Sequence, residues 1–217
     1  MTESGRADSE DLAEHRDWFE NLYTEADAGR VEVPWDRKGP NKVFAQWAEE
    51  HQVRGEGGRA LVVGSGLGSD SEYVASLGFA TTGFDFAAAA IEEVRRRYPD
   101  SPVEYRVADL LDPPDEWTGA FDLVVESLTV QSLPRQFRAQ AIDRVRHFVA
   151  PGGTLLVISG VAEEWEDGPD GPWPLTRAEI ESFAADGLDL VRLETPPGID
   201  GSPRWRAQLH RRQRPSR

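Results

Sequence analysis

Short runs of apolar residues alternate along the chain with longer stretches in which apolar residues recur at helical spacing. The apolar runs have the length of buried strands and are predicted at residues 59–64, 80–85, 103–107, 121–126 and 154–159. The helical spacing predicts helices at residues 69–77, 87–98 and 135–149, with stop signals near Asp100 and Pro151. This alternation predicts an α/β fold built on a mostly parallel sheet.

The last part of the chain carries different signals. Residues 163–174 are acidic and rich in Gly and Pro, and Thr176 with Glu179 then matches a capping box, so a helix is predicted to begin there. Apolar runs at 189–194 and 205–210, joined through Pro and Gly, predict an antiparallel hairpin at the sheet edge. The prediction is therefore one doubly wound sheet of seven strands, mostly parallel, with helices on both faces.

One domain is expected over residues 1–217, because this length buries one sizeable core and is short for two. We divide it into an aromatic N-terminal segment (1–55), a central core (56–160) and a C-terminal helix with the edge hairpin (161–217). The aromatic residues of the N-terminal segment are Trp18, Phe19, Tyr23, Trp35, Phe44 and Trp47. This density fits either packing against the core or a lid over a bound ligand, and both interpretations stay open.

The chain is strongly acidic, with a formal net charge of -15 and a pI near 4.7. Nucleic-acid-binding proteins usually present a basic face, so we expect no nucleic-acid partner. Basic residues gather only near the C-terminus, where they fit either a local positive patch or a solvated last strand and frayed tail. They are Arg204, Arg206, His210, Arg211, Arg212, Arg214 and Arg217.

Signals for a membrane, for secretion and for metal binding are missing from the sequence. No apolar run approaches the roughly 20 residues that a membrane span needs, and residues 1–20 are acidic and polar. We therefore expect a cytoplasmic protein with no membrane partner. Cysteine is absent, which excludes disulfides, thiolate metal sites and a cysteine nucleophile, and we expect no metal site.

Three glycines at alternate positions, Gly64, Gly66 and Gly68, follow the first predicted strand and precede a helix. Glycine lacks a β-carbon and tolerates positive φ, so a ligand can approach the backbone closely there. Dinucleotide sites use a similar strand, loop and helix, but their G-x-G-x-x-G fingerprint needs glycine at position 69, which is Ser69. The loop therefore favours a methyl donor over a dinucleotide.

Two carboxylates follow the next two strands of the prediction. Asp85 ends the second strand at about the expected 20 residues beyond the glycine loop, where a carboxylate can accept hydrogen bonds from both hydroxyls of a ribose. Asp109 and Leu110 follow the third strand, where a carboxylate and a neighbouring amide can read the amino edge of an adenine. Both positions indicate a nucleoside-containing ligand.

Together these residues resemble the class I S-adenosylmethionine-dependent methyltransferases over residues 59–160, in the family's order of motifs. The resemblance implies a single Rossmann-like domain, S-adenosylmethionine as the cofactor and residues 56–160 as its binding core. It implies that the glycines pass the methionine moiety, that Asp85 holds the ribose, and that Asp109 frames the adenine. The cofactor-binding residues it implies are Trp35, Gly64, Ser65, Gly66, Gly68, Asp85, Phe86, Asp109, Leu110, Glu126 and Ser127.

A narrower resemblance reaches both ends of the chain. Residues 18–23, the run Val33-Pro34-Trp35-Asp36 and the run from Gly171 to Thr176 resemble the thiopurine and thiol or halide methyltransferases. In that group the N-terminal segment covers the bound donor, which implies that Trp35 lies near it.

The activity that the resemblance implies is methyl transfer to a small molecule. Displacement at a sulfonium mainly requires holding the nucleophile, methyl carbon and leaving sulfur in line. A thiol, with a reference pKa near 8.5, is already partly ionised at neutral pH and fits the absence of an obvious base, although Glu126 and Asp36 are candidate catalytic residues. No catalytic residue is assigned.

Several alternatives remain at this point. The acceptor atom can be O or N of a small metabolite, or the chain can be a donor-binding module without turnover. A nicotinamide-dependent oxidoreductase would use a similar nucleoside site, but the Tyr-x-x-x-Lys pair of short-chain dehydrogenases is absent, since Lys38 and Lys42 are the only lysines. The sequence names neither the acceptor nor the oligomeric state.

Overall fold

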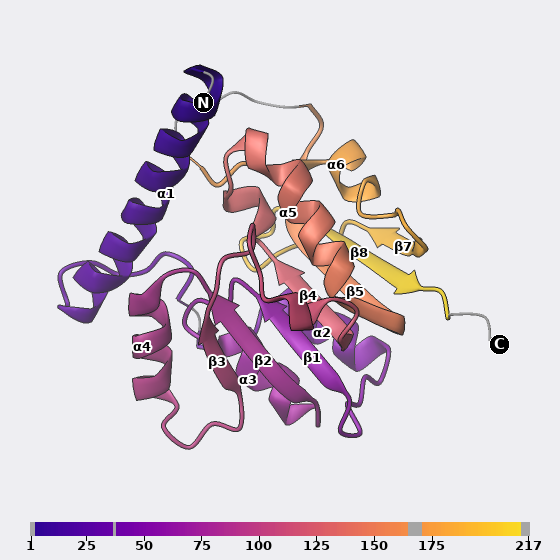
Figure 1. Cartoon of the computed structure of the whole chain (residues 1–217). Helices are drawn as coiled ribbons and strands as arrows, with labels where there is room; N and C mark the ends of the chain where they lie inside the picture. The colour runs from indigo at the N-terminus through magenta and orange to yellow at the C-terminus, as the bar shows by residue number, and fades with distance from the viewer. Residues whose placement is uncertain (1–2, 37, 165–170, 214–217) are drawn as a thin grey trace.

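Eight strands form one sheet in the computed structural model, which describes residues 3–36, 38–164 and 171–213 (Figure 1). The strands are β1 (Arg59–Val63), β2 (Ala80–Asp85), β3 (Glu104–Val107), β4 (Phe121–Ser127), β5 (Val149–Ala162), β6 (Leu175–Thr176), β7 (Leu188–Glu194) and β8 (Arg204–Arg211). Their order is β3-β2-β1-β4-β5-β8-β7, and β6 pairs with β5 outside this path. Strands β1 to β5 pair in parallel, whereas β8 is antiparallel to both β5 and β7.

Helices cover both faces of this sheet (Figure 1). They are α1 (Glu3–Asp27), α2 (Lys42–Glu50), α3 (Ser69–Ser76), α4 (Ala88–Arg97), α5 (Arg135–Phe148) and α6 (Arg177–Glu181), with short 3-10 turns η1 (Asp115–Trp117) and η2 (Val130–Ser132). Buried residues of α5 and α6 share one hydrophobic cluster, and those of α2 and α3 share another. None of the described helices combines the length and the apolarity that crossing a membrane needs.

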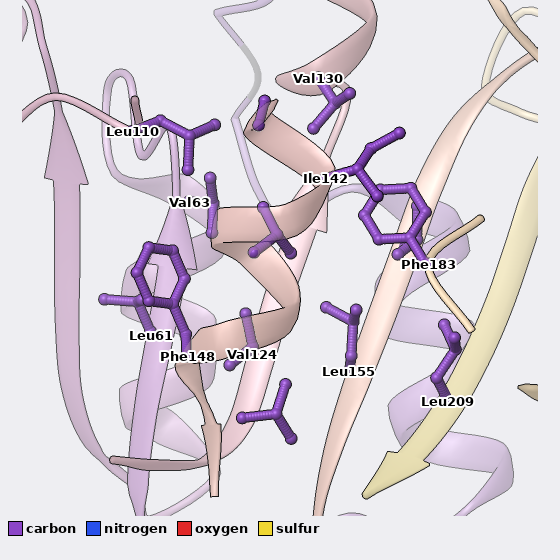
Figure 2. Close-up of a cluster of buried hydrophobic side chains, with 14 of the residues drawn as sticks. Leu61, Val63, Leu110, Val124, Val130, Ile142, Phe148, Leu155, Phe183 and Leu209 are labelled. Carbon is purple, nitrogen blue, oxygen red and sulfur yellow. The ribbon is translucent and has the colours of Figure 1, made fainter. Parts of the chain in front are cut away.

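Alternation along the strands sends side chains into both layers of the core. Leu61 and Val63 of β1 join the cluster under α5, whereas Ala60 and Val62 join the cluster under α2 and α3. Figure 2 shows the α5 side, where Phe148 lies beside Leu61. Strands buried on both faces read as continuous apolar runs, so the predicted doubly wound α/β fold is confirmed.

Boundaries differ from the prediction mainly at β5. This strand begins at Val149 rather than at residue 154, because the chain pairs with β4 through an irregular register before the regular ladder starts. We interpreted the Pro and Gly there as a turn, and Gly152 does have φ of 82°. The capping box is confirmed: the Thr176 hydroxyl accepts from the Glu179 amide at 3.3 Å, and the Glu179 carboxylate accepts from the Thr176 amide at 2.8 Å.

The N-terminal segment, residues 1–55, does not act as one unit, and the two interpretations apply to different parts of it. Phe44 and Trp47 lie on α2, are buried and pack beneath the sheet with Val62, so this part belongs to the core. Phe19 and Tyr23 lie on α1, which runs outside α4 and contacts it (Figure 1). Packing therefore explains α2, whereas α1 and the stretch that contains Trp35 are placed to cover a ligand.

The basic C-terminal cluster is not an open positive patch within the described residues. Arg206 is buried and pairs with Glu50 at 2.8 Å and Glu194 at 2.7 Å. Arg212 pairs with Asp189 at 2.7 Å, while Arg214 and Arg217 lie outside the described residues. These arginines neutralise acids on neighbouring elements, and β8 lies between β5 and β7 with half of its residues buried, so neither an open positive patch nor a solvated strand describes the cluster.

Candidate functional site

A cavity of about 1120 Å³ opens at the carboxyl ends of the parallel strands. It lies where β1 and β4 are neighbours and the strand order reverses, the place at which open α/β sheets bind ligands. Of the implied cofactor-binding residues, the cavity lining includes Trp35, Gly64, Ser65, Gly66, Gly68, Asp85, Phe86, Asp109, Leu110 and Ser127. The structure therefore brings together all the implied residues except Glu126.

The glycine loop packs tightly against the chain behind it. Gly64 has φ of 60°, and a β-carbon there would lie 2.3 Å from the Thr129 hydroxyl. That hydroxyl donates to the Val63 carbonyl at 2.9 Å. The backbone of the loop is thus held in a conformation that a side chain at position 64 would disrupt.

Asp85 joins the end of β2 to this loop. Its carboxylate accepts from the Gly66 amide at 2.9 Å and from the Ala87 amide at 3.0 Å. Burial raises its pKa to about 6, and the backbone hydrogen bonds oppose that rise. A buried carboxylate at a cavity wall, ionised only above mildly acidic pH, is suited to accepting hydroxyl hydrogen bonds from a ligand.

Asp109 lies at the end of β3 and faces α1. One of its carboxylate oxygens accepts from the Leu111 amide at 2.9 Å. The other pairs with the guanidinium of Arg16, which α1 brings across the cavity. The helix that covers the cavity is thereby tied to a carboxylate of the cavity wall.

Aromatic side chains of the N-terminal segment cover the glycine loop. Tyr23 is buried, and its hydroxyl accepts from the Trp35 indole nitrogen at 2.9 Å. A β-carbon on Gly66 would lie 3.2 Å from the Tyr23 hydroxyl. Phe19 packs edge-on against Phe86, with ring centroids 5.8 Å apart. These contacts close one side of the cavity with apolar surface.

The opposite end of the cavity is shaped by a buried arginine. Arg138 of α5 is 2% exposed and donates to the carbonyls of Trp173 at 2.7 Å and Gln131 at 3.2 Å. Its guanidinium also pairs with Glu179 at 3.0 Å. Trp173 and Gln131 both line the cavity, so Arg138 positions two segments of its wall without reaching it.

Glu126, a candidate for both catalysis and cofactor binding, does not line the cavity. It is fully buried, and one carboxylate oxygen accepts from the Thr129 and Val130 amides at 2.8 and 2.9 Å. Its second oxygen has no hydrogen-bond partner among the described residues. Burial raises its pKa to about 7, against the effect of the two amides. The geometry assigns it to holding the turn after β4.

Glu126→Gln is expected to flatten part of the pH dependence of stability. A carboxyl whose folded pKa lies above its unfolded value stabilises the fold while protonated, and that contribution is lost as pH rises from about 4.5 to about 7. The free energy of unfolding of the wild type should fall relative to the variant by on the order of 3 kcal/mol across this range. Urea unfolding at a series of pH values measures the free energy of unfolding of both proteins. Parallel plots of this free energy against pH for the wild type and the variant would contradict the prediction.

Asp36, the other catalytic candidate, lies outside the cavity. Both of its carboxylate oxygens accept from Arg97 of α4 at 2.8 Å. Trp35, the residue before Asp36, lines the cavity. Asp36 does not, because its ion pair with Arg97 holds its side chain against α4. We therefore assign Asp36 to anchoring the covering segment.

The cavity-facing side of α1 was identified from the sequence only through its aromatic residues, and Leu12, His15 and Arg16 were not. Leu12, His15, Arg16, Phe19 and Tyr23 all line the cavity. Their spacing follows one face of a helix, so helical periodicity in the first 25 residues was the signal that could have identified them. Arg138 carried no comparable signal, because its role depends on contacts with segments distant in the chain.

The described residues include one group with metal-ligand geometry, Asp143, His147 and Asp186. Arg146 already pairs with Asp143 and, at 3.1 Å, with Asp186. A guanidinium between the two carboxylates supplies the positive charge that a metal would bring, so we assign no metal to this group.

Residues 61–157 match the family model described as a methyltransferase domain. The chain is also 28% identical over 190 residues to a probable thiol methyltransferase of Arabidopsis thaliana, covering 83% of this chain and 81% of the relative. The chain is a class I S-adenosylmethionine-dependent methyltransferase. Its cofactor is therefore S-adenosylmethionine, and the nicotinamide alternative is dropped.

Solved structures support the fold of this methyltransferase. One is the 1,6-didemethyltoxoflavin N1-methyltransferase of Burkholderia thailandensis with bound S-adenosylhomocysteine, at a TM-score of 0.72 and 16% identity, covering 94% of this chain and 90% of that one. Another comes from work on the conversion of a disulfide bond into a thioacetal group in echinomycin biosynthesis, at a TM-score of 0.71 and 18% identity, covering 89% and 93%. At these identities the likeness concerns the fold.

Proposed function

We propose that this methyltransferase acts on a small-molecule thiol, and that its whole chain forms one catalytic domain. The choice of a thiol as the acceptor rests on the similarity to a probable thiol methyltransferase over most of both chains. The cavity supports a small acceptor, because α1 and its aromatic side chains cover it from the solvent side.

The glycine-loop half of the cavity fits the donor. Asp85 offers a buried carboxylate for the ribose hydroxyls, and Asp109 with Leu110 lies at the neighbouring strand end for adenine. The buried hydroxyl of Ser65 has no partner among the described residues, which suits a ligand at that wall. A side chain at Gly66 would project into the space between the loop and Tyr23.

Bound S-adenosylmethionine supplies a methyl group activated by its sulfonium. The acceptor sulfur bonds to that methyl carbon while the carbon–sulfonium bond breaks, leaving S-adenosylhomocysteine and a methyl thioether. The chain's part is to hold the acceptor in line and to exclude water, which the Trp173 and Gln131 wall and the α1 cover are placed to do. The acceptor thiol loses its proton to solvent water before it is enclosed, so the thiolate sulfur is the nucleophile.

Three carboxylates of the lining, Asp70, Asp85 and Asp109, already accept hydrogen bonds from the chain, which leaves few groups to act as a base and favours a thiol. His15 is the histidine in the described lining, and burial together with the nearby Arg16 lowers its pKa, so it is neutral near neutral pH. A neutral imidazole can accept a proton from an acceptor hydroxyl. This residue therefore makes a phenol O-methyltransferase the second candidate function.

Paired acceptors distinguish the two candidates. We expect thiophenol to be methylated with a kcat/KM at least about tenfold above that of phenol near pH 7.5, because a larger share of the thiol is ionised. The measurement is the formation of S-adenosylhomocysteine by chromatography. A higher kcat/KM for phenol, lost in His15→Ala, would overturn the thiol proposal in favour of the second candidate. S-adenosylmethionine binding without methylation of any thiol, phenol or amine would indicate a donor-binding module.

A further inference from the structure

A smaller hollow of about 300 Å³ adjoins the main cavity. The two share Gly39, Asn41 and Arg204 in their linings. Asn41 links them directly, since its side-chain amide donates to the Ser127 hydroxyl at 3.0 Å, and Ser127 lines the main cavity. The two hollows therefore adjoin along Gly39, Asn41 and Arg204.

The charge of this hollow is opposite to that of the protein. The chain carries a net charge of -15 and has two lysines in all, and both Lys38 and Lys42 line the hollow together with Arg204. Among the residues that the structure describes, no acidic side chain lines it. Asp200 pairs with Arg204 at 2.8 Å, and Asp70 accepts from the backbone amide of Asn41 at 2.6 Å. Asp200 therefore balances the charge of Arg204, and Lys38 and Lys42 carry the positive charge of the hollow.

The position of Lys42 is unfavourable for the helix that bears it. Lys42 is the first residue of α2, whose first turn has no acidic residue, so its charge adds to the positive end of the helix dipole. Asn41 already caps that helix, its side-chain oxygen accepting from the Val43 amide at 3.0 Å. We therefore expect an anion in the hollow to be held by the two lysine side chains, beside the Arg204–Asp200 ion pair.

We propose that this hollow binds a carboxylate carried by the methyl acceptor, so that the enzyme prefers acidic acceptors over neutral ones of the same shape. The proposal rests on the proposed thiol acceptor and names its chemical class: a thiol with an anionic end. Lys38 and Lys42 are specificity-determining residues, because they contact the non-reacting end of the substrate.

The test compares para-mercaptobenzoate with para-mercaptobenzamide, which differ in charge and have similar size. The wild type should show a kcat/KM ratio of acid to amide of about tenfold, and Lys38→Gln/Lys42→Gln should bring that ratio close to unity. Added salt should lower the wild-type ratio by screening. The matched control is Arg54→Gln/Arg144→Gln, which removes the same charge from exposed positions outside both hollows and should keep the wild-type ratio.

Binding of the methylated products separates this proposal from the proposed function. In calorimetry with S-adenosylhomocysteine present, para-(methylthio)benzoate should bind about tenfold more tightly than para-(methylthio)benzamide, and the double lysine variant should lose the difference. Equal binding of the two in the wild type overturns the carboxylate site, even if thiols are methylated. A lysine-dependent preference without thiol turnover keeps the site and overturns the thiol acceptor.

Discussion

Asp85→Asn is expected to weaken binding of S-adenosylmethionine roughly 10- to 100-fold, the loss of about 1.5 to 3 kcal/mol from a hydrogen bond to a charged group. The carboxylate is buried at the cavity wall and already holds the amides of Gly66 and Ala87. An asparagine keeps one acceptor oxygen but turns the other into a donor, which cannot accept from a hydroxyl or from the loop amide. Titration calorimetry with the donor measures the loss.

The same experiment has a pH signature. The pKa of Asp85 is raised to about 6, so its carboxylate is protonated at lower pH. The affinity of the wild type for the donor should therefore fall as the pH decreases below 6, and the fall should approach about tenfold for each pH unit. The Asn variant should lack this dependence. The matched control is Asp189→Asn, which removes an exposed carboxylate of β7 that pairs with Arg212. This variant should bind the donor normally. An unchanged affinity in Asp85→Asn would remove this residue from the donor site.

Gly64→Ala is expected to destabilise the fold by about 3 kcal/mol and to prevent donor binding. A residue with a β-carbon at φ of 60° costs about 1 to 2 kcal/mol, and the new methyl would overlap the Thr129 side chain at 2.3 Å, which adds an overpacking cost of similar size. Urea unfolding measures the change in free energy, and calorimetry measures the loss of donor affinity.

Gly119 provides the matched control for this change. Its φ of 63° is nearly the same, but a β-carbon there meets no atom within 4 Å, so Gly119→Ala should show the conformational cost alone, about 1 kcal/mol. Adding Thr129→Ala to Gly64→Ala removes the overlapping atoms and should restore part of the stability. Equal destabilisation by the two single glycine substitutions would contradict the packing argument.

The strands of the central fold were predictable from local periodicity, whereas the helix α1 was not predicted. The strands β1, β2 and β4 are short apolar runs bounded by turn residues, and this pattern needs no knowledge of distant contacts. The sequence of helix α1 is mostly polar, and its residues Phe19 and Tyr23 both pack in a cluster with α4 and line the cavity, so composition alone obscured it.

The candidate site shows the same division. Asp85 and Glu126 both end apolar strands in the sequence, and both were implied to contact the donor. In the structure Asp85 faces the cavity, whereas Glu126 turns inward to hold the amides of Thr129 and Val130. A strand end fixes the position of a residue, but neighbouring packing decides which way its side chain points.

Sequence patterns alone were enough to predict the α/β architecture, the glycine loop and the carboxylates that we propose for the donor site, because each follows from short-range pattern and from the shared edge of parallel strands. Only the tertiary structure showed that Arg16 reaches Asp109, that Arg138 positions the far wall, and that both lysines meet Arg204 beside the cavity. These contacts join segments far apart in the chain, and no local pattern encodes them, since they depend on how the covering helix and the loops settle on the finished sheet.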